Sequence, residues 1–278
     1  MTWKSTPLQM ELLERFRPVL SRVSGPVQLT EELIEALTIE ADGAIRVIWA
    51  PFGYMRDDER AQAVLVGITP GRYQAERALS AFRDAFVEGS GLQDAIDRVK
   101  ATASFGGPLR ANLVAMLDHI GLQGALGLPS CGDLFRSSGE LVHFTSALHY
   151  PVFVNGANYS GTPDFLRTKM LRDWLDKTLA EDARRLSRRL WIPLGPKPAK
   201  ALRYLADRGV IDPIKILDGL PHPSGANAER IAYFLGRKAR SALSVKTAPQ
   251  AIEAAHDKLR EQVRMLKAPL VRLVHTAT

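Results

Sequence analysis

Short apolar runs alternate along the chain with segments in which apolar residues recur every three or four positions. The runs are too short for helices and are rich in β-branched or aromatic residues, a combination that predicts strands. They cover residues 45–50, 63–67, 141–147, 190–194 and 215–220. Helical spacing covers residues 76–88, 109–120, 164–188, 199–208 and 252–266. This alternation predicts an α/β fold with a mainly parallel sheet covered by helices on both faces.

The chain shows no internal repeat, no low-complexity tract and no long Gly/Ser linker. We therefore expect a single domain over residues 1–278, with a core of about residues 45–240, an N-terminal helical extension and a C-terminal helix. The C-terminal segment places five apolar residues on one face: Ile252, Ala255, Leu259, Val263 and Leu266. Such a face is either core or partner surface, and we predict core.

The composition excludes several classes of protein. Hydrophobic residues make up 46% and charged residues 24% of the 278, which fits a folded domain and not a disordered chain. The single cysteine, Cys131, excludes a disulfide framework and any zinc or iron–sulfur site built from several thiolates. No segment has the apolar length of a signal peptide or membrane span, so we expect no membrane partner. The single cysteine fits a reducing compartment, and we expect a cytoplasmic protein. We also expect a monomer.

Charge is divided unevenly between the two halves of the chain. Residues 1–140 carry 14 basic and 18 acidic side chains, whereas residues 141–278 carry 23 basic and 12 acidic ones. A basic C-terminal half suits a polyanionic partner such as nucleic acid, although basic side chains on helix faces are often only solvated. The charge therefore makes nucleic-acid binding a hypothesis and does not establish it.

Three loops contain the candidate chemistry, because ligands of such sheets bind beyond the carboxyl ends of the strands. The first follows the predicted strand 63–67 and reads GITPGRYQ, a turn whose backbone can cradle a phosphate or a base. The second places Phe105 in a Gly/Pro-rich segment, where its ring either stacks on a base or anchors the loop. The third fixes His222 between Pro221 and Pro223, with Asn227 placed to cap the next helix.

Five segments follow one another in a familiar order: GITPG, SFGGPLRANLVAML, HFTSAL, LWIPLGPKPAKAL and HPSGAN. In this series the chain resembles the uracil-DNA glycosylase superfamily over about residues 45–240. The resemblance implies a three-layer α/β/α sandwich and an enzyme that flips a base out of DNA and hydrolyses its N-glycosidic bond, leaving an abasic site. It implies no metal and no organic cofactor. The other histidines lack metal-ligand spacing and are expected to be structural: His119, His143, His149, His256 and His275.

The resemblance also implies roles for single residues. His222 matches the histidine that hydrogen-bonds the carbonyl of the departing base and so stabilises its developing negative charge. Phe105 matches the residue that stacks on the flipped base, and Ser224 with its neighbouring backbone is expected to grip phosphate. Gly225 and Ala226 occupy the place from which many members insert a side chain into the gap left by the base, and Ala226 is a poor wedge.

Two departures from the family's pattern bear on the substrate. The position that usually holds an Asp or Asn to place the attacking water is Thr69, and the neighbouring Ile68 offers no carboxylate either. A hydroxyl can still orient a water, which a strongly dissociative cleavage needs more than proton abstraction, and Gln74 and Glu76 are candidates to assist. Ser146 stands where an asparagine normally reads the uracil edge, so we expect a larger pocket that is less specific for uracil.

Three hypotheses about function stay open. The insertion at residues 149–162 brings Asn155, Asn158 and Tyr159, groups that suit a sugar, unless the insertion is only a polar loop. The first hypothesis is therefore excision of a bulky modified cytosine, the glucosylated hydroxymethylcytosine of phage DNA, in antiviral defence. The alternatives are uracil or mismatched-base excision repair, and a catalytically inactive DNA-binding module.

DNA is thus the expected partner, and His222 and Thr69 are the expected catalytic residues. The expected base-binding set is Gly67, Ile68, Tyr73, Gln74, Phe105, Ser146, Asn155, Asn158 and Tyr159. The expected DNA-binding set is Pro70, Gly71, Arg72, Lys197, Lys200, Ser224, Gly225, Ala226, Asn227 and Arg230, with Arg237 and Lys238 as further basic candidates.

Overall fold

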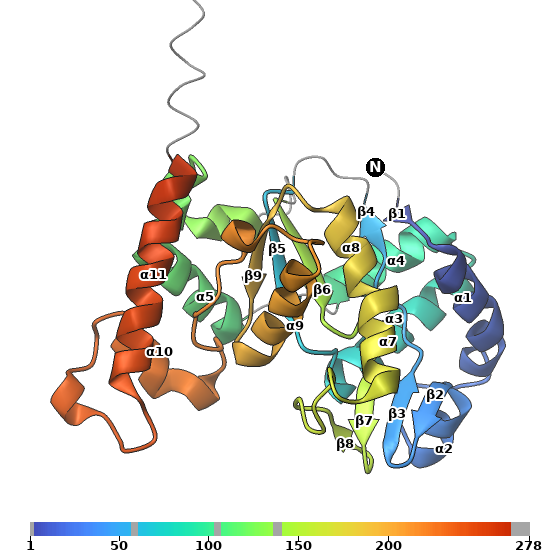
Figure 1. Ribbon diagram of the computed structural model, residues 1–278. Coiled ribbons are helices and arrows are strands. Elements are labelled where there is room, and N and C mark those ends of the chain that lie inside the picture. The colour runs from blue at the N-terminus through green and yellow to red at the C-terminus, as the bar shows by residue number, and fades with distance from the viewer. Residues whose placement is uncertain (1–2, 57–60, 103–106, 136–140, 268–278) are drawn as a thin grey trace, which may run out of the picture. The chain divides into compact units, whose positions relative to one another are not determined.

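The computed structural model describes residues 3–56, 61–102, 107–135 and 141–267. The chain forms two compact units, each assembled from separate stretches of sequence (Figure 1). The first unit comprises Met1–Glu59, Gly67–Ser104 and Thr145–Arg185, and the second comprises Arg60–Val66, Phe105–Phe144 and Leu186–Thr278. Each unit has its own buried core.

A three-stranded parallel sheet in the order β6-β5-β9 forms the centre of the second unit. Its strands are β5 (Ala63–Gly67), β6 (Val142–Ser146) and β9 (Leu190–Pro193), which confirms three of the predicted strands. The first four residues of β5 are buried, as are all four of β9. A continuous apolar run is what a strand covered on both faces requires, and it made these strands predictable.

The strand predicted at residues 215–220 is wrong. Pro213–Lys215 form a 3-10 turn (η2), which Asp212 caps by accepting a backbone hydrogen bond at 3.0 Å. Beyond the turn, Ile216 makes an isolated parallel bridge to Trp191. Gly219 then adopts a φ of +133°, outside the range of extended strand residues. The turn and this glycine confine pairing to a single bridge.

Helices surround the parallel sheet in the second unit. They are α5 (Gly107–His119), α6 (Leu122–Ala125), α9 (Pro196–Asp207), α10 (Ala228–Phe234) and α11 (Pro249–Lys267), with 3-10 turns η1 (Cys131–Phe135), η3 (Gly225–Asn227) and η4 (Arg240–Ala242). Figure 1 shows α10 and α11 side by side, and the two helices are in contact. Leu259 and Val263 of α11 are buried in one core with Leu65 and Ile192 of the sheet, so the predicted core role of the C-terminal helix is confirmed.

An antiparallel sheet in the order β2-β3-β7-β8 lies in the first unit. Its strands are β2 (Thr38–Asp42), β3 (Ile45–Ile48), β7 (Val152–Val154) and β8 (Ala157–Asn158), and β1 (Trp3–Lys4) separately pairs with β4 (Met55–Arg56). The strand predicted at residues 45–50 therefore exists, but it pairs antiparallel with β2 and β7 and does not join the parallel sheet. The fold is mixed α/β, as predicted.

Six helices of the first unit pack on this sheet and on one another in the described residues: α1 (Pro7–Leu20), α2 (Glu31–Ala36), α3 (Arg72–Val87), α4 (Leu92–Thr102), α7 (Lys169–Lys177) and α8 (Leu179–Arg185). The first two lie in the N-terminal stretch of the first unit. The single helix predicted at residues 164–188 is instead two, α7 and α8, which meet at Thr178. Trp49 anchors the core, with ring centroids 5.8 Å from Phe16 and 5.9 Å from Phe82. None of the described helices has both the length and the apolar character needed to cross a membrane.

Candidate functional site

The loop at residues 67–74, which we term the threonine loop, joins β5 to α3 in the first unit. The Thr69 hydroxyl donates a hydrogen bond to the Tyr150 carbonyl at 2.9 Å. A Cβ placed on Gly67 would lie 3.5 Å from the Ser146 hydroxyl oxygen, so these two members of the expected base-binding set are neighbours. Because the Thr69 proton is already donated, the hydroxyl oxygen can accept a hydrogen bond from water but offers no base.

Arg72 has a structural role, because its guanidinium, which we expected to contact DNA, is engaged within the protein. Its guanidinium donates hydrogen bonds to the Leu29 carbonyl and, at 2.8 Å, to the Gly156 carbonyl. The same group lies over the Phe153 ring, 4.9 Å from the centroid, and the Arg72 backbone N–H donates to Asn158 Oδ1 at 2.8 Å. The side chain therefore ties the start of α3 to the β7-β8 hairpin. Pro70 is also buried, which removes it from the expected DNA-binding set.

Replacing Arg72 is expected to lower the stability of the fold. The Arg72→Gln variant leaves two carbonyls without their donors, at a cost of about 1–3 kcal/mol each if water cannot reach them. Urea unfolding of purified protein measures the loss. Lys169→Gln is the control, because Lys169 forms an exposed ion pair with Asp173 that contributes little. Equal midpoints for Arg72→Gln and wild type would contradict this role.

The insertion at residues 149–162 is a hairpin and not an irregular loop. Asn155 and Gly156 form its turn with φ values of 49° and 72°, the positive angles that a tight hairpin turn needs. Asn155 is exposed and Asn158 is exposed but has its Oδ1 occupied by Arg72. Tyr159 is only 4% exposed and its hydroxyl donates to the Pro163 carbonyl. Of the three predicted sugar-binding groups, Tyr159 is a structural residue.

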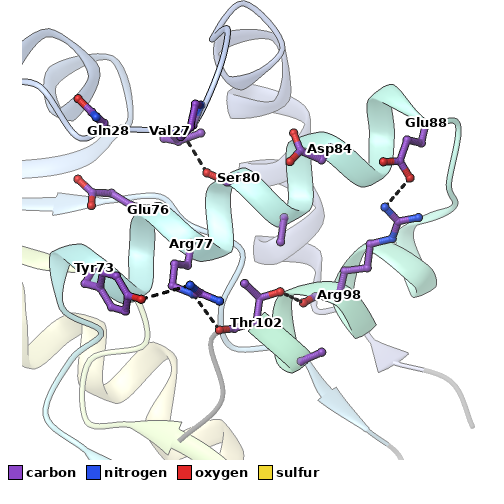
Figure 2. Close-up of a pocket in the computed structure, with 13 residues that line it drawn as sticks. Val27, Gln28, Tyr73, Glu76, Arg77, Ser80, Asp84, Glu88, Arg98 and Thr102 are labelled. Atoms are coloured by element: carbon purple, nitrogen blue, oxygen red, sulfur yellow. Dashed lines mark hydrogen bonds and ion pairs between the residues drawn. The ribbon is translucent and has the colours of Figure 1, made fainter. Parts of the chain in front are cut away.

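Tyr73 and Gln74 face different surroundings from those predicted. Tyr73 is 69% exposed and lines a surface cavity of about 680 Å³ (Figure 2), where its hydroxyl oxygen accepts from Arg77 at 3.2 Å. Gln74 caps α3 by accepting the Gly71 N–H at 3.2 Å. Glu76, at the same cavity, accepts the Leu29 N–H at 3.0 Å through one carboxylate oxygen, so both Gln74 and Glu76 make structural hydrogen bonds. The cavity walls are thus held by internal hydrogen bonds.

The histidine loop, residues 220–227 in the second unit, holds His222 half-buried. The Ser224 backbone N–H donates to Nδ1 of His222 at 3.2 Å. Because Nδ1 accepts this bond, the neutral ring carries its proton on Nε2, which is then a hydrogen-bond donor. Burial lowers the pKa of His222 below its ordinary value of 6.5, so the ring is neutral at pH 7.

Two residues that the sequence reasoning missed fix this loop. Asn112 of α5 donates from Nδ2 to the Pro223 carbonyl at 2.9 Å. Gly195, which precedes α9, has a φ of +97°, and a Cβ there would lie 3.3 Å from Cβ of His222. Only glycine combines that conformation with so close an approach. The GP step after a predicted strand was the available signal for Gly195, whereas Asn112 lay unmarked in a helical pattern.

The other residues of the histidine loop divide into bonded and exposed ones. Ser224 accepts from Asn227 Nδ2 at 3.2 Å, and Arg230 donates to Asn227 Oδ1 at 2.8 Å. Asn227 is the N-cap residue of α10, as predicted, but its side chain makes no capping hydrogen bond. Gly225 and Ala226 are exposed at the tip of the loop. The tip of the histidine loop can therefore contact a ligand through its backbone but has no large side chain to insert.

The basic candidates also divide. Lys197 is exposed and Lys200 half-buried near the start of α9, and Arg237 is exposed after α10. Lys238 is paired with Glu229 at 2.8 Å, which makes its predicted contact with DNA unsupported. Phe105 lies outside the described residues. Among the described residues, no group of three or more His, Cys, Asp or Glu side chains is placed to hold a metal ion.

Comparison with known proteins gives one similarity. The chain is 27% identical to the uncharacterized protein YoxB of Bacillus subtilis (strain 168) over 237 residues, which cover 84% of this chain and 92% of that protein. No family model matches the chain. No solved structure matches it significantly. The printed name of this relative states no activity.

Proposed function

We propose that this protein is a DNA glycosylase that flips a modified pyrimidine out of DNA and hydrolyses its N-glycosidic bond. The observation that carries the proposal is the state of His222: half-buried, neutral, and with its proton on Nε2 because Nδ1 accepts the Ser224 N–H. A neutral imidazole fixed by its own backbone is suited to donate to an oxygen that gains negative charge. The proposal includes the three-layer sandwich that the family resemblance implies.

In this mechanism the bond between sugar and base breaks largely before water attacks. Negative charge then accumulates on the carbonyl oxygen of the departing base, to which Nε2 of His222 donates a hydrogen bond. Asn112 and Gly195 act as positioning residues, because they hold the loop without contacting the base. A fixed donor needs no reorganisation as the charge develops, which is the source of its catalytic effect.

Thr69 is the residue we propose to orient the attacking water. Its hydroxyl hydrogen is fixed on the Tyr150 carbonyl, so the oxygen presents its lone pairs in a set direction. An oxocarbenium-like sugar is a strong electrophile and needs a placed water more than a strong base. The missing carboxylate is therefore compatible with catalysis.

The proposed substrate is a cytosine that carries a bulky polar substituent, such as a glucosylated hydroxymethyl group of phage DNA, and the proposed role is antiviral defence in the cytoplasm. Ser146, which lies beside Gly67, has a smaller side chain than the asparagine of the family pattern. Asn155 remains exposed for a sugar. The DNA backbone would meet Ser224, Gly225, Ala226, Lys197, Lys200 and Arg230, while Arg72, Pro70 and Tyr159 are omitted for their structural roles.

Three DNA substrates test the proposal: DNA from a phage that carries glucosylated hydroxymethylcytosine, DNA with uracil, and DNA with mismatches. Each is incubated with purified protein and then treated with alkali, which cleaves abasic sites. Cleavage confined to the phage DNA is the expected result. Cleavage of uracil or mismatched DNA alone would replace this substrate with a repair substrate. Salt-sensitive binding without cleavage of any substrate would indicate a binding module.

The excision rate should remain constant as the pH falls to about 6.5 and decline only below it. Because burial lowers the pKa of His222, the ring gains a proton at a lower pH than a free imidazole and then loses the bond from Ser224. At pH values between the folded and unfolded pKa of this histidine, the unfolded chain binds more protons than the folded one. The free energy of unfolding therefore decreases as the pH is lowered below about 6.5. Single-turnover rates and urea unfolding across this range measure the two effects. A rate that rises on acidification would contradict the neutral donor.

A further inference from the structure

The connection between α10 and α11 holds one valine entirely in solvent. Val245 is 103% exposed, while Thr247 two residues later is buried. Figure 1 shows this connection extending beyond the ends of both helices. We term residues 237–247 the stapled loop.

The loop is ordered by one carboxylate. Glu229 of α10 accepts hydrogen bonds from Lys238 at 2.8 Å, from the Ser244 N–H at 3.1 Å and hydroxyl at 2.6 Å, and from the Thr247 hydroxyl. These donors hold the pKa of Glu229 well below its usual range, so the carboxylate is charged at every relevant pH. Arg230 adds a bond at 3.2 Å to the Lys246 carbonyl. Val245 therefore sits on a fixed support and not on a freely moving segment.

The charged residues near Val245 in the sequence are mostly basic. Residues 228–247 contain five basic side chains and one acidic one, Glu229, whose charge is taken up by the bonds above. Arg230, Arg237, Arg240 and Lys246 are exposed. Arg240 contacts Glu253 of α11 at 3.4 Å, and among the described residues the structure records no carboxylate paired with Arg237 or Lys246. Lys246 follows Val245 directly and Arg230 donates to the Lys246 carbonyl, so two cationic residues adjoin the exposed valine.

We propose that the stapled loop is a DNA-contacting surface, in which Val245 inserts between base pairs from the minor groove while the flanking basic side chains bind phosphates. Proteins that kink DNA use this combination, because an apolar wedge replaces stacking and basic groups neutralise the backbone on either side. The inference rests on the proposed function only in taking DNA as the substrate. The valine lies beyond residues 45–240, which carry the family resemblance.

The chemistry favours DNA over a protein partner. A stable protein interface buries on the order of 1,200 Å² or more and has several apolar side chains at its centre. Val245 is one fully exposed apolar side chain in a segment whose exposed charged side chains are all basic, which matches a polyanion that offers one narrow apolar step. Ala226 at the tip of the histidine loop has too small a side chain for this task, so Val245 supplies what that loop lacks.

The first test compares binding to two duplexes, one fully paired and one with a tetrahydrofuran abasic-site analogue, which requires no catalysis. Val245→Ala should raise the Kd for the abasic duplex about tenfold, the loss expected for two buried methyl groups. The Kd for the paired duplex should change less. Val87→Ala is the matched control, because Val87 is 75% exposed on α3 in the first unit and should leave both Kd values unchanged.

A second variant reports insertion directly. Cys131 is completely buried, so a Val245→Cys variant carries one reactive thiol that accepts an environment-sensitive fluorophore. Adding the abasic duplex should shift its emission to the blue. In parallel, Lys246→Gln should reduce the slope of log K against log salt by about one. Unchanged emission together with unchanged Kd in Val245→Ala would overturn the proposal.

The two proposals can fail separately. If Val245→Ala binds and excises as wild type does, the stapled loop is not a DNA surface and the glycosylase assignment stands. If the labelled loop inserts into DNA but wild type excises no base, the surface stands and the activity does not. If wild type fails to bind either duplex, the stapled-loop proposal is overturned together with the proposed partner.

Discussion

Replacing His222 with alanine is expected to lower the single-turnover excision rate about 10²–10³-fold, the effect of removing one fixed donor from a developing anion. The structural reason is that the Ser224 N–H donates to Nδ1 of His222. The ring orientation is thereby fixed, and the proton on Nε2 is available as a hydrogen-bond donor. His222→Gln, which keeps an N–H donor on a longer and less constrained side chain, should retain part of the rate. The measurement is abasic-site formation with enzyme in excess over DNA.

Binding and stability serve as controls for that result. The Kd for uncleaved DNA should change little in His222→Ala, because the contact forms in the transition state and not in the ground state. The urea midpoint should also stay close to wild type, since the ring is only half-buried and Asn112 still holds the Pro223 carbonyl. Excision at the wild-type rate by His222→Ala would remove this histidine from the mechanism.

Replacing Asp182 with alanine is expected to cause a large loss of stability, about 2–6 kcal/mol, because two buried groups, the Thr145 hydroxyl and the His149 ring, lose their shared partner at about 1–3 kcal/mol each. Asp182 Oδ2 lies 3.0 Å from His149 Nε2 and accepts the Thr145 hydroxyl at 2.8 Å. The histidine and aspartate side chains are each 5% exposed, so their partners are lost away from bulk solvent. This cluster belongs to the first unit, whereas the proposed catalytic residue His222 belongs to the second.

Urea unfolding of three variants measures this effect. Asp182→Asn retains a carbonyl oxygen and should lose less stability than Asp182→Ala. Asp173→Asn, at an exposed aspartate paired with Lys169 on the neighbouring helix α7, should unfold close to wild type. If Asp182→Ala and Asp173→Asn unfold alike, the buried cluster contributes no stability.

The parallel sheet could be predicted because its signal is local. Val64, Leu65 and Val66 form a continuous buried run, and such a run appears in the sequence without knowledge of its partners. The antiparallel sheet depends on pairing between β3 at Ile45–Ile48 and β7 at Val152–Val154, which no local pattern records. The error at residues 215–220 arose because apolar spacing was read without the turn at Pro213 and the conformation of Gly219.

The same distinction holds for the candidate site. His222 could be identified from its two flanking prolines, which are adjacent in sequence. The inward role of Arg72 could not, because its acceptors are the carbonyls of Leu29 and Gly156, remote from it in the chain. Exposed basic residues and buried structural ones look alike in a sequence, and only the identity of the acceptor separates them.

The interleaving of the two units has a consequence for synthesis on the ribosome. The last stretch of the first unit ends at Arg185, whereas the core of the second unit needs Leu259 and Val263 of α11. At typical synthesis rates the intervening stretch takes roughly 4–16 s to produce. Once β9 (Leu190–Pro193) has been made early in that interval, all three strands of the parallel sheet are present but lack the helix that covers part of their core. We expect nascent chains halted before α11 to bind chaperones through this half-covered sheet and to release them once α11 emerges.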